Sequence, residues 1–524
     1  MWNYFLWVFF SACVASQRVE ETLGSHWRQT GYKSIQSSLF LRSIEGRAKN
    51  VILFLGDGMG ISTVTATRIY KGQKKGGQGE DEQLAFDKFP YVSLSKTYGL
   101  DRQTSDSANT ATAYLCGVKA NCGTLGVDGR VKYQDCSSSL DNSTHVDSVL
   151  SWAQEAGKWT GLITTTRVTH ATPAGLYSHS ASREWEGACP DSRCPDIAKQ
   201  LIQHSPGKDI RVIMGGGLRN FLPSGSEYRG AEGKRNDSLN LLNEWLDDKS
   251  AKRGKAVFTA KELLTLDTTN VDYLIGLFHA DHLPYVLDRP TLPDPTQYPS
   301  LAEMTAAGIE VLRKNDEGYF LLVEGGSIDL AHHMNWAMKS LEEGYQFDKA
   351  IQTALNMTDS KDTLIIVTAD HSHTFTIGGD YPIRGSNVLG LGGVSDVDNR
   401  TYTTLGYHNG PGYKMDSRER NLTQEEALNK DFKMDTALPL SYETHGAEDV
   451  GVYALGPWAH LFHGVHDQSY IAYVMGHAAC MGPHVDLAQC SSALSNLMAG
   501  GWFTVGKMLF MTVTSYVFSV YRLS

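Results

Sequence analysis

The stretch NVILFLG, at residues 50–56, is an apolar run that leads directly into Asp57. Its apolar residues do not alternate with polar ones, so the run predicts a β-strand that is buried on both faces. Six further runs of this kind follow along the chain: TGLITTT (160–166), DIRVIMGG (209–216), DYLIGLF (272–278), GYFLLVEGG (318–326), TLIIVTAD (363–370) and DVGVYALG (449–456).

Helical patterns lie between several of these runs. In SLAEMTAAGIEVLRKN (300–315), for example, the apolar residues recur at helical spacing. Strands that alternate with helices predict an α/β fold, with a large, mainly parallel central sheet and helices on both faces. The span of about 379–440 breaks this pattern because it is rich in Gly, Asp, Asn and Tyr, and we expect it to form an inserted surface subdomain.

Length and charge restrict the class of protein. A chain of 524 residues is long enough for one large core or for two or three domains. Its net charge of −11 offers no basis for binding nucleic acid, which would need a basic surface. No nucleic-acid partner is therefore expected.

Both ends of the chain carry targeting signals. Residues 1–16 begin with an apolar run and end in small residues, which predicts a signal peptide; a buried first helix is the alternative. At the other end, small residues at Ser491 precede a spacer and a hydrophobic tail. This order predicts a glycosylphosphatidylinositol (GPI) anchor at Ser491 and removal of residues 492–524. A retained membrane span is the alternative, but Lys507 lies within the roughly 20 residues that would cross the bilayer.

The mature chain is thus expected to span 17–491, on the extracellular face of the plasma membrane. Glycosylation sequons, which matter only in a secreted chain, start at Asn142, Asn236, Asn356, Asn399 and Asn421. Seven of the eight cysteines lie beyond the signal peptide, and they predict up to three disulfides and one free thiol. The close pair Cys480 and Cys490 is the best candidate for a local loop.

Acidic and histidine side chains follow four of the apolar runs, at the strand ends where ligands bind in open α/β sheets. A single Asp after a strand is usually a turn or cap residue, but four such ends would bring together carboxylates that repel one another unless cations bind. The residues concerned are Asp57; Arg167, His170 and Thr172; Glu324, Asp329, His332 and His333; and Asp370, His371 and His373.

The spacing of these residues indicates which metals bind. Asp329 and His333 lie four residues apart, so one helical face presents both to the same ion. Asp370 and His371 are adjacent, and both reach one ion only if the strand has ended and the chain has turned. Asp and His without cysteine suit catalytic zinc, whereas Glu, Asp and a threonine hydroxyl suit magnesium.

The hydroxyl-rich stretch QTSDSANTATAYL (103–115) offers a candidate nucleophile. A serine hydroxyl beside bound zinc loses its proton near neutral pH, and a helix N-terminus presents N–H groups to an anion. Phosphate is the anion that needs both features and an arginine, because a guanidinium grips two of its oxygens. The residues therefore predict metal-assisted phosphoryl transfer through a phosphoserine, without identifying which serine or arginine takes part.

The motifs DGMG, DSANTATAYLCGVKAN, TTTRVTHATPAG, VEGGSIDLAHH, TADHSH and ETHGAEDV occur in an order that closely resembles that of the membrane-bound animal alkaline phosphatases. The resemblance runs from about Asn50 to Cys490. It implies the alkaline phosphatase fold and hydrolysis of varied phosphate monoesters at alkaline pH through a phosphoserine. It also implies two Zn²⁺ and one Mg²⁺ per subunit, a GPI-anchored homodimer, and a variable crown subdomain at 379–440.

The resemblance assigns a role to each matched residue. Ser107 matches the nucleophile, and Arg183 matches the arginine that clamps the phosphate. Asp106 would pair with the backbone and this arginine, and His170, His332 and His373 would be neighbours of the ligands or simply hydrogen-bonded polar groups. The matched ligands are Asp329, His333 and His445 for the first zinc; Asp57, Asp370 and His371 for the second; and Asp57, Thr172 and Glu324 for magnesium.

The resemblance also implies disulfides between Cys136 and Cys194 and between Cys480 and Cys490. The two extra cysteines, Cys122 and Cys189, are expected to pair with each other, which leaves Cys116 free. Three positions depart from the family pattern. Asn109 stands where the family usually has Gly, so a side chain beside the nucleophile would alter access or contact the phosphate. Leu330 replaces a histidine of the vertebrate enzymes, which implies a different network on the magnesium side. His279, after Phe278, replaces the Glu of the vertebrate calcium site, so no calcium site is expected.

Three alternatives compete with a phosphomonoesterase. A sulfatase would need a C/S-x-P-x-R setting, which is absent around Ser107. Phosphodiesterase relatives typically use threonine and lack this arginine and magnesium arrangement. A catalytically weakened surface binding protein on the same fold is disfavoured because all matched ligands are present, although Asn109 keeps it open.

Overall fold

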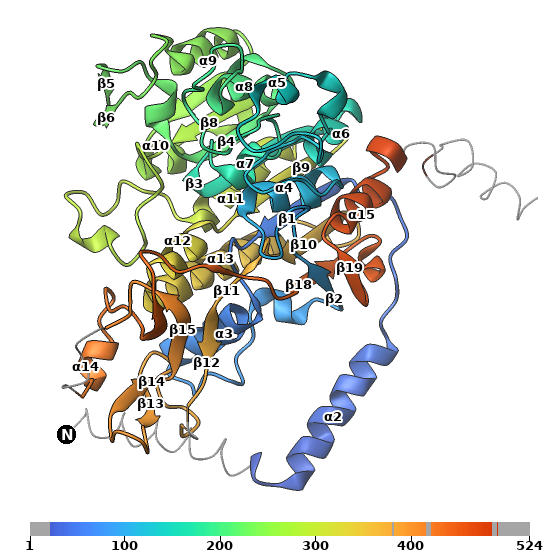
Figure 1. Cartoon of the computed structure of the whole chain (residues 1–524). Coiled ribbons are helices and arrows are strands. Elements are labelled where there is room, and N and C mark those ends of the chain that lie inside the picture. The colour runs from blue at the N-terminus through green and yellow to red at the C-terminus, as the bar shows by residue number, and fades with distance from the viewer. Residues whose placement is uncertain (1–20, 380–381, 415–420, 485–489, 491–524) are drawn as a thin grey trace, which may run out of the picture.

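A ten-stranded sheet runs through the centre of the structure (Figure 1). The computed structural model describes residues 21–379, 382–414, 421–484 and 490. The seven strands from β10 to β7 are all parallel, whereas β18 is antiparallel to both of its neighbours, and this architecture confirms the predicted fold class. In spatial order the strands are β19 (Val465–Asp467), β2 (Tyr91–Lys96), β18 (Val450–Leu455), β10 (Thr363–Thr368), β1 (Asn50–Leu55), β9 (Tyr319–Glu324), β3 (Trp159–Arg167), β4 (Val212–Gly216), β8 (Tyr273–Leu277) and β7 (Gly254–Val257).

Each of the seven apolar runs forms a strand of this sheet. The sequence did not predict β2, β7 and β19. In β2 buried and more exposed residues alternate, and β7 and β19 have four and three residues, so none of them reads as a long apolar run. Edge and near-edge strands carry the weakest pattern because they are only partly covered.

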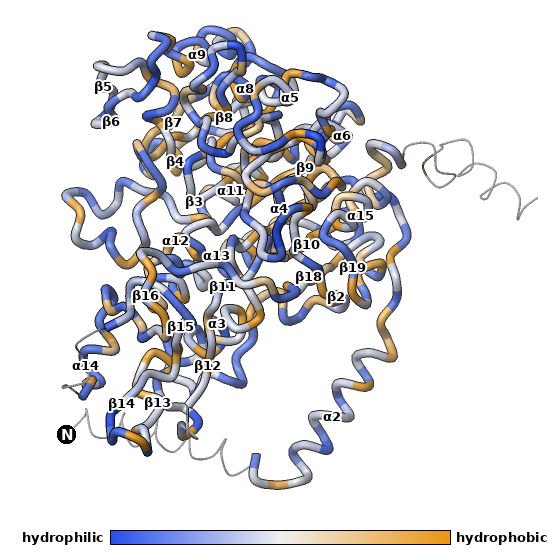
Figure 2. Tube along the Cα trace, in the orientation of Figure 1, coloured by the Kyte–Doolittle hydropathy of each residue, from blue (hydrophilic) through white to orange (hydrophobic). Residues whose placement is uncertain are grey.

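Both faces of the sheet are buried, as the apolar runs predict. In β1, Val51, Leu53 and Leu55 belong to one hydrophobic cluster, whereas Ile52 and Phe54 belong to another on the opposite face. Hydrophobic residues accordingly gather along the central strands (Figure 2). The first face is covered by α4 (Ser107–Cys116), α6 (Val149–Glu155), α8 (Ile197–Gln203), α9 (Leu241–Ser250) and α15 (Tyr470–Ala479), and the second by α3 (Ile61–Lys74), α11 (Leu301–Leu312) and α13 (Ala337–Met357).

Shorter helices fill the connections. They are α5 (Cys136–Ser139), α7 (Ala171–Ala174), α10 (Ala260–Leu264), α12 (Ser327–His333) and α14 (Gln424–Ala427). The predicted helix at 300–315 is α11, which Ser300 and Glu303 start with a reciprocal capping box.

Two small sheets form within and beside the predicted insertion. They consist of β12 (Phe375–Ile377), β15 (Leu405–Gly410) and β16 (Thr436–Pro439), and of β13 (Leu391–Val394) and β14 (Thr401–Thr403). Their core, which includes Phe375, Leu405 and Tyr407, packs against Ala66 of α3 and Leu341 of α13. The orange segment in Figure 1 therefore has its own small core, and it is joined to the main body through two helices.

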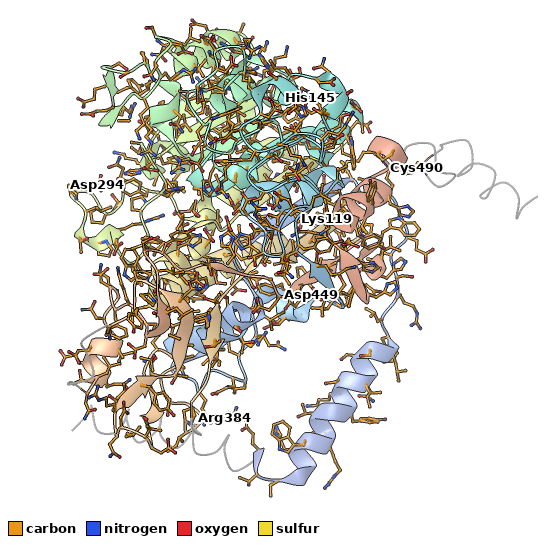
Figure 3. All side chains as sticks on the ribbon, in the orientation of Figure 1. Lys119, His145, Asp294, Arg384, Asp449 and Cys490 are labelled. Carbon is orange, nitrogen blue, oxygen red and sulfur yellow. A yellow bond between two sulfur atoms is a disulfide. The ribbon has the colours of Figure 1, made fainter. Side chains whose placement is uncertain are left out.

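Helix α2 (Gly24–Leu39) stands clear of the main body, and none of its residues is buried (Figures 1 and 3). The predicted signal peptide and GPI signal, including Ser491, lie outside the described residues. Within the part of the chain that the structure describes, no helix has the length and apolar character needed to cross a membrane.

Two of the three expected disulfides are present, Cys136–Cys194 and Cys480–Cys490. The expected bond between Cys122 and Cys189 is wrong, because both are free thiols, as is Cys116. The backbone N–H of Cys122 donates to Asp101 Oδ1 (2.8 Å), whereas Cys189 packs against the apolar cluster around Cys136–Cys194. The two thiols are thus held in different surroundings.

Helix α4 packs closely against α7, and the small residues of α4 allow this approach. A Cβ added to Gly175, which follows α7, would lie 2.7 Å from the Cβ of Ala111 and 3.5 Å from its carbonyl carbon. Both helices carry predicted site residues, so their spacing positions the site.

We predict that Gly175→Ala lowers the free energy of unfolding by about 1–3 kcal/mol through overpacking. The φ of Gly175 is −58°, so the backbone tolerates alanine and the cost is steric. Chemical denaturation would measure it, with Gly46→Ala as the matched control, because an added Cβ at Gly46 meets nothing within 4 Å. Equal stabilities of the two variants would contradict the close packing.

Candidate active site

Four neighbouring parallel strands deliver the predicted site residues to one edge of the sheet. Asp57 follows β1, Asp370 follows β10, Glu324 ends β9, and Thr172 lies in α7 shortly after β3. Because these strands lie in the order β10, β1, β9, β3, their carboxyl ends are adjacent. The topology therefore gathers residues that are far apart in sequence.

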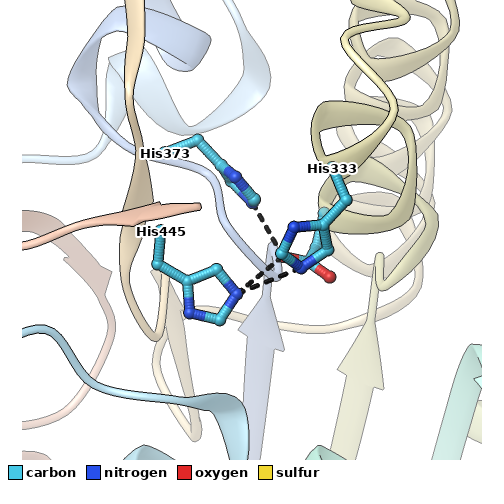
Figure 4. Close-up of side chains that lie close together, drawn as sticks. His333, His373 and His445 are labelled. Carbon is cyan, nitrogen blue, oxygen red and sulfur yellow. Dashed lines mark hydrogen bonds and ion pairs between the residues drawn. The ribbon is translucent and has the colours of Figure 1, made fainter. Parts of the chain in front are cut away.

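A first group surrounds Asp329, whose Oδ1 lies 2.7 Å from His373 Nε2, 3.3 Å from His333 Nε2 and 3.4 Å from His445 Nε2. Helix α12 places Asp329 and His333 one turn apart, as predicted. The antiparallel pair β11 (Ser372–His373) and β17 (His445–Gly446) sets His373 directly opposite His445. The three imidazoles point toward one another (Figure 4), and this group could hold a metal ion.

A second group lies deeper. His371 Nε2 is 3.1 Å from Asp370 Oδ2 and 3.6 Å from Asp57 Oδ1, and all three side chains are fully buried. Both carboxylate oxygens of Asp57 and Oδ2 of Asp370 have no hydrogen-bond partner. Asp57, His371 and Asp329 each offer a ligand atom within 4.8 Å of the others, so the first and second groups adjoin.

A third group joins Asp57 to Glu324 and His170. Glu324 Oε2 accepts hydrogen bonds from the hydroxyls of Thr164 and Thr166, whereas its Oε1 has no partner. The hydroxyl of Thr172 accepts a hydrogen bond from the hydroxyl of Tyr114 (3.4 Å). His170 Nδ1 is a further buried atom without a partner.

These carboxylates are costly in the absence of cations. Burial raises the pKa of Asp57 well above its ordinary value, and the neighbouring charges of Asp329, Asp370 and Glu324 raise it further. Burial likewise raises the pKa of Glu324 to about 7. Buried polar atoms are normally paired, so the unpaired oxygens of this centre fit divalent cations, which take oxygen and imidazole ligands.

Ser107 begins α4 beside the second group, and its Oγ lies 3.2 Å from His371 Nε2. The sequence starts the helix here because the side chain of Asp106 accepts hydrogen bonds from the N–H groups of Ala108 and Asn109 (3.3 Å each). Asp106 Oδ1 also accepts from the N–H of Gly123 (2.9 Å). The cap thus fixes the serine hydroxyl at a helix N-terminus.

Arg183 joins this cap to the third group. Its Nη1 donates to Asp106 Oδ2 (3.0 Å), and its Nη2 lies 3.2 Å from His170 Nε2. Burial opposes ionisation of Asp106, but the charge of Arg183 and the N–H of Gly123 lower the pKa of this carboxyl. An anion beside Ser107 would therefore meet a fixed guanidinium.

A cavity of about 670 Å³ opens over Ser107 and Arg183. The first metal-binding group lines it through Asp329, His333 and His445. The sequence did not predict its other lining residues, which include Arg102, Cys122, Tyr133, Glu184 and Tyr442. They lie on loops and at element ends, where no motif marks them.

His332, predicted as a neighbour of the ligands or a hydrogen-bonded polar group, has its ring centre 4.7 Å from that of His373 but makes its own hydrogen bonds to other elements. His332 Nε2 lies 3.0 Å from Thr63 Oγ1 and Nδ1 lies 2.8 Å from the hydroxyl of Tyr407, so His332 joins α12 to α3 and β15. It belongs to none of the three groups of possible metal ligands. It is therefore a hydrogen-bonded structural residue, whereas His170 and His373 each belong to a group that could hold a metal ion.

The sequence missed a role for Glu443. This buried carboxylate accepts from His373 Nδ1 (2.5 Å), and its backbone carbonyl accepts from His333 Nδ1 (2.6 Å). Glu443 thereby fixes the orientation of two imidazoles, which is a common arrangement around metal ligands. Its position two residues before His445, on the same side of an extended segment, was the available signal.

Asn109 does not line the cavity, contrary to the expectation that it contacts phosphate or alters access. Its Oδ1 accepts a hydrogen bond from the N–H of Asp106 (3.1 Å), which closes a reciprocal capping box. Its Nδ2 faces Gly99, where an added Cβ would lie 2.0 Å away. Asn109 thus completes the start of α4.

We expect Asn109→Ala to lower the free energy of unfolding by about 0.5–2 kcal/mol, because the N–H of Asp106 loses its partner. Thermal or chemical unfolding would measure this loss. The matched control is Asn243→Ala, since Asn243 holds the same position in α9 without a reciprocal bond to its cap. A loss as large in the control would show that the capping bond is not the cause.

Comparison with known proteins identifies the family. The family model described as alkaline phosphatase matches residues 48–481. The chain is 45% identical over 514 residues to the tissue-nonspecific alkaline phosphatase of Homo sapiens, which covers 95% of this chain and 96% of that protein. It is 47% identical over 471 residues to the alkaline phosphatase of Gadus morhua, covering 87% and 97%. The solved alkaline phosphatase of the Antarctic bacterium TAB5 shares the fold, with a TM-score of 0.59, 23% identity and coverage of 84% and 99%. This chain therefore belongs to the alkaline phosphatase family.

Proposed function

We propose that this protein hydrolyses a broad range of phosphate monoesters at alkaline pH through a phosphoserine on Ser107. The observation that carries the proposal is the position of Ser107, which lines the cavity together with Arg183 and whose Oγ lies 3.2 Å from His371 Nε2. Family membership supports the same reaction. No observation favours a phosphodiesterase or a weakened binding protein.

The three groups of ligands would hold two zinc ions and one magnesium ion, and the unpaired buried carboxylate oxygens support this. When bound, the metals would favour deprotonation of hydroxyl groups and neutralise charge on the phosphate. We assign Asp329, His333 and His445 to the first zinc, Asp57, Asp370 and His371 to the second, and Asp57, Thr172 and Glu324 to magnesium.

The side chains of the protein have separate roles in the two steps of the reaction. Ser107 Oγ loses its proton and forms a bond to phosphorus, the bond from phosphorus to the leaving oxygen breaks, and that oxygen takes up a proton and departs as the alcohol. Water then attacks the phosphoserine, which releases inorganic phosphate and restores Ser107. Arg183, oriented by Asp106, grips two phosphate oxygens through both steps. Glu443 keeps His333 and His373 oriented throughout.

Replacing Ser107 by Ala should lower kcat for p-nitrophenyl phosphate by about 10³-fold or more, because the nucleophile is lost. A chelator should abolish the activity of the wild type, and added zinc and magnesium should restore it. Ser105→Ala is the matched control: Ser105 is also buried, its hydroxyl has no partner, and its backbone carbonyl, which faces His445 Nδ1, is kept. Hydrolysis that survived both the serine change and the chelator would contradict the mechanism.

We further propose a glycosylated protein that is held on the outer face of the plasma membrane by a GPI anchor at Ser491. The sequence signals at both ends support this location. All five sequon residues, Asn142, Asn236, Asn356, Asn399 and Asn421, are exposed, which suits attachment of glycans.

We also propose a homodimer, and helix α2 supports it. An isolated helix of 16 residues is marginal in water, yet α2 buries none of its residues within the chain. Trp27, Tyr32, Ile35 and Leu39 are 57–67% exposed. A second copy of the chain would cover these side chains.

The paired change Trp27→Asp and Ile35→Asp should therefore shift the protein from dimer toward monomer in sedimentation velocity. Ser34→Asp is the control, since it adds a charge to the same helix at an exposed polar position. A dimer that persists in the Trp27 and Ile35 variant would exclude α2 from the interface.

A further inference from the structure

Asn335 lies directly beyond the helix that carries Asp329 and His333, in a left-handed conformation with φ of 56°. The N–H of Asn335 donates to His332 O (2.8 Å) and that of Trp336 donates to Ala331 O (3.0 Å). These two bonds form a Schellman motif, in which glycine is the usual left-handed residue and asparagine the less common one. The backbone alone would therefore favour glycine here.

The side chain of Asn335 gives a reason for asparagine. It is fully buried, its Nδ2 donates to Asn409 O (3.2 Å), and its Oδ1 accepts from the N–H of Gly412 (2.9 Å). Its backbone carbonyl accepts from the N–H of Met434 (3.0 Å). Asn335 thus hydrogen-bonds to the backbone of three residues of the inserted segment, and both polar atoms of its side-chain amide have a partner.

The contacts continue to the other side of the metal-binding group. The side chain of Asn409 exchanges two hydrogen bonds with Thr444: Nδ2 donates to Thr444 Oγ1 (2.9 Å), and the N–H of Thr444 donates to Oδ1 (3.0 Å). Thr444 is the residue before His445. Two asparagines therefore connect the end of α12, which carries His333, to the strand that carries His445.

Such a connection matters because His333 and His445 come from opposite sides of the inserted segment in the sequence. Among the described residues, β17 pairs with the two-residue strand β11, and the backbone of Glu443, two residues before His445, exchanges hydrogen bonds with His333. The contacts of Asn335 and Asn409 add a second connection on the side of the inserted segment. Close approach reinforces the contact: a Cβ on Gly410 would lie 2.3 Å from Asn335 Oδ1. The packing leaves little freedom for the amide to shift.

We propose that Asn335 is a positioning residue for the metal held by Asp329, His333 and His445, an inference that rests on the proposed function. Its side-chain amide joins the inserted segment to the end of α12 through hydrogen bonds, and these bonds help to set the distance between His333 and His445. Asn335 touches neither substrate nor metal, and it acts through the backbone of Asn409 and through Thr444.

The test compares zinc release and metal geometry in the full-length protein. Asn335→Gly keeps the left-handed backbone and removes the amide, and Gln134→Gly is the matched control, at an exposed residue with φ of 66°. Transfer of zinc from the loaded protein to a chromophoric chelator should be 10–100-fold faster in Asn335→Gly, the usual effect of removing a residue that supports metal ligands. The visible spectrum of the cobalt-substituted protein should shift in the same variant, which a mere loss of stability would not cause.

Asn409→Ala breaks the second link of the same chain of contacts, and it carries the test if Asn335→Gly fails to fold. Its zinc release should also be faster, and the double variant should release zinc more slowly than the product of the two separate effects, because both changes break the same chain of contacts. Release within twofold of the wild type, together with an unchanged cobalt spectrum in Asn335→Gly and Asn409→Ala, would overturn the inference. Failure of the proposed function would instead appear as a wild type that neither binds zinc nor hydrolyses p-nitrophenyl phosphate.

Discussion

The structure depends on the burial of carboxylates that have too few partners within the protein. Asp57 belongs to two of the three groups of ligands and hydrogen-bonds through neither of its oxygens. Buried carboxylates are normally paired or bind metal ions, and here the neighbouring histidines and threonines would supply the rest of each ligand set. Phosphoryl transfer follows from this arrangement, because the cations that stabilise the carboxylates also attract a phosphate to Ser107 and Arg183.

Strand order converts this chemical requirement into a fold. Asp57, Glu324 and Asp370 each stand at the end of a strand, and the strands that bear them are direct neighbours in a parallel sheet. Apolar contacts on both faces stabilise these strands, and this stabilisation offsets the repulsion between the carboxylates at their ends. Side chains on separate surface loops would be free to move apart under the same repulsion.

The sequence predicted the parts of this architecture that have a local signature. Runs such as NVILFLG predict buried strands, and the spacing of Asp329 and His333 predicts that both lie on one helical face. The motif resemblance added Ser107 and Arg183, which pattern alone did not single out. What it missed depends on tertiary contacts: Glu443 has a role only because His373 folds against it, and the sequence around Asn109 does not show whether its side chain faces the cavity or the cap. The pairing of Cys122 with Cys189 failed for the same reason, since counting cysteines says nothing about their surroundings.

The pairing of β11 with β17 has a consequence for how the centre is assembled during folding. The second group of ligands, Asp57, Asp370 and His371, follows strands of the central sheet directly and can form as soon as that sheet does. The first group needs His445, which reaches Asp329 only after the whole inserted segment has closed its loop and docked. Because the inserted segment lies between β10 and β18, which pair in the central sheet, its length sets the entropic cost of closing the loop that brings His445 to Asp329.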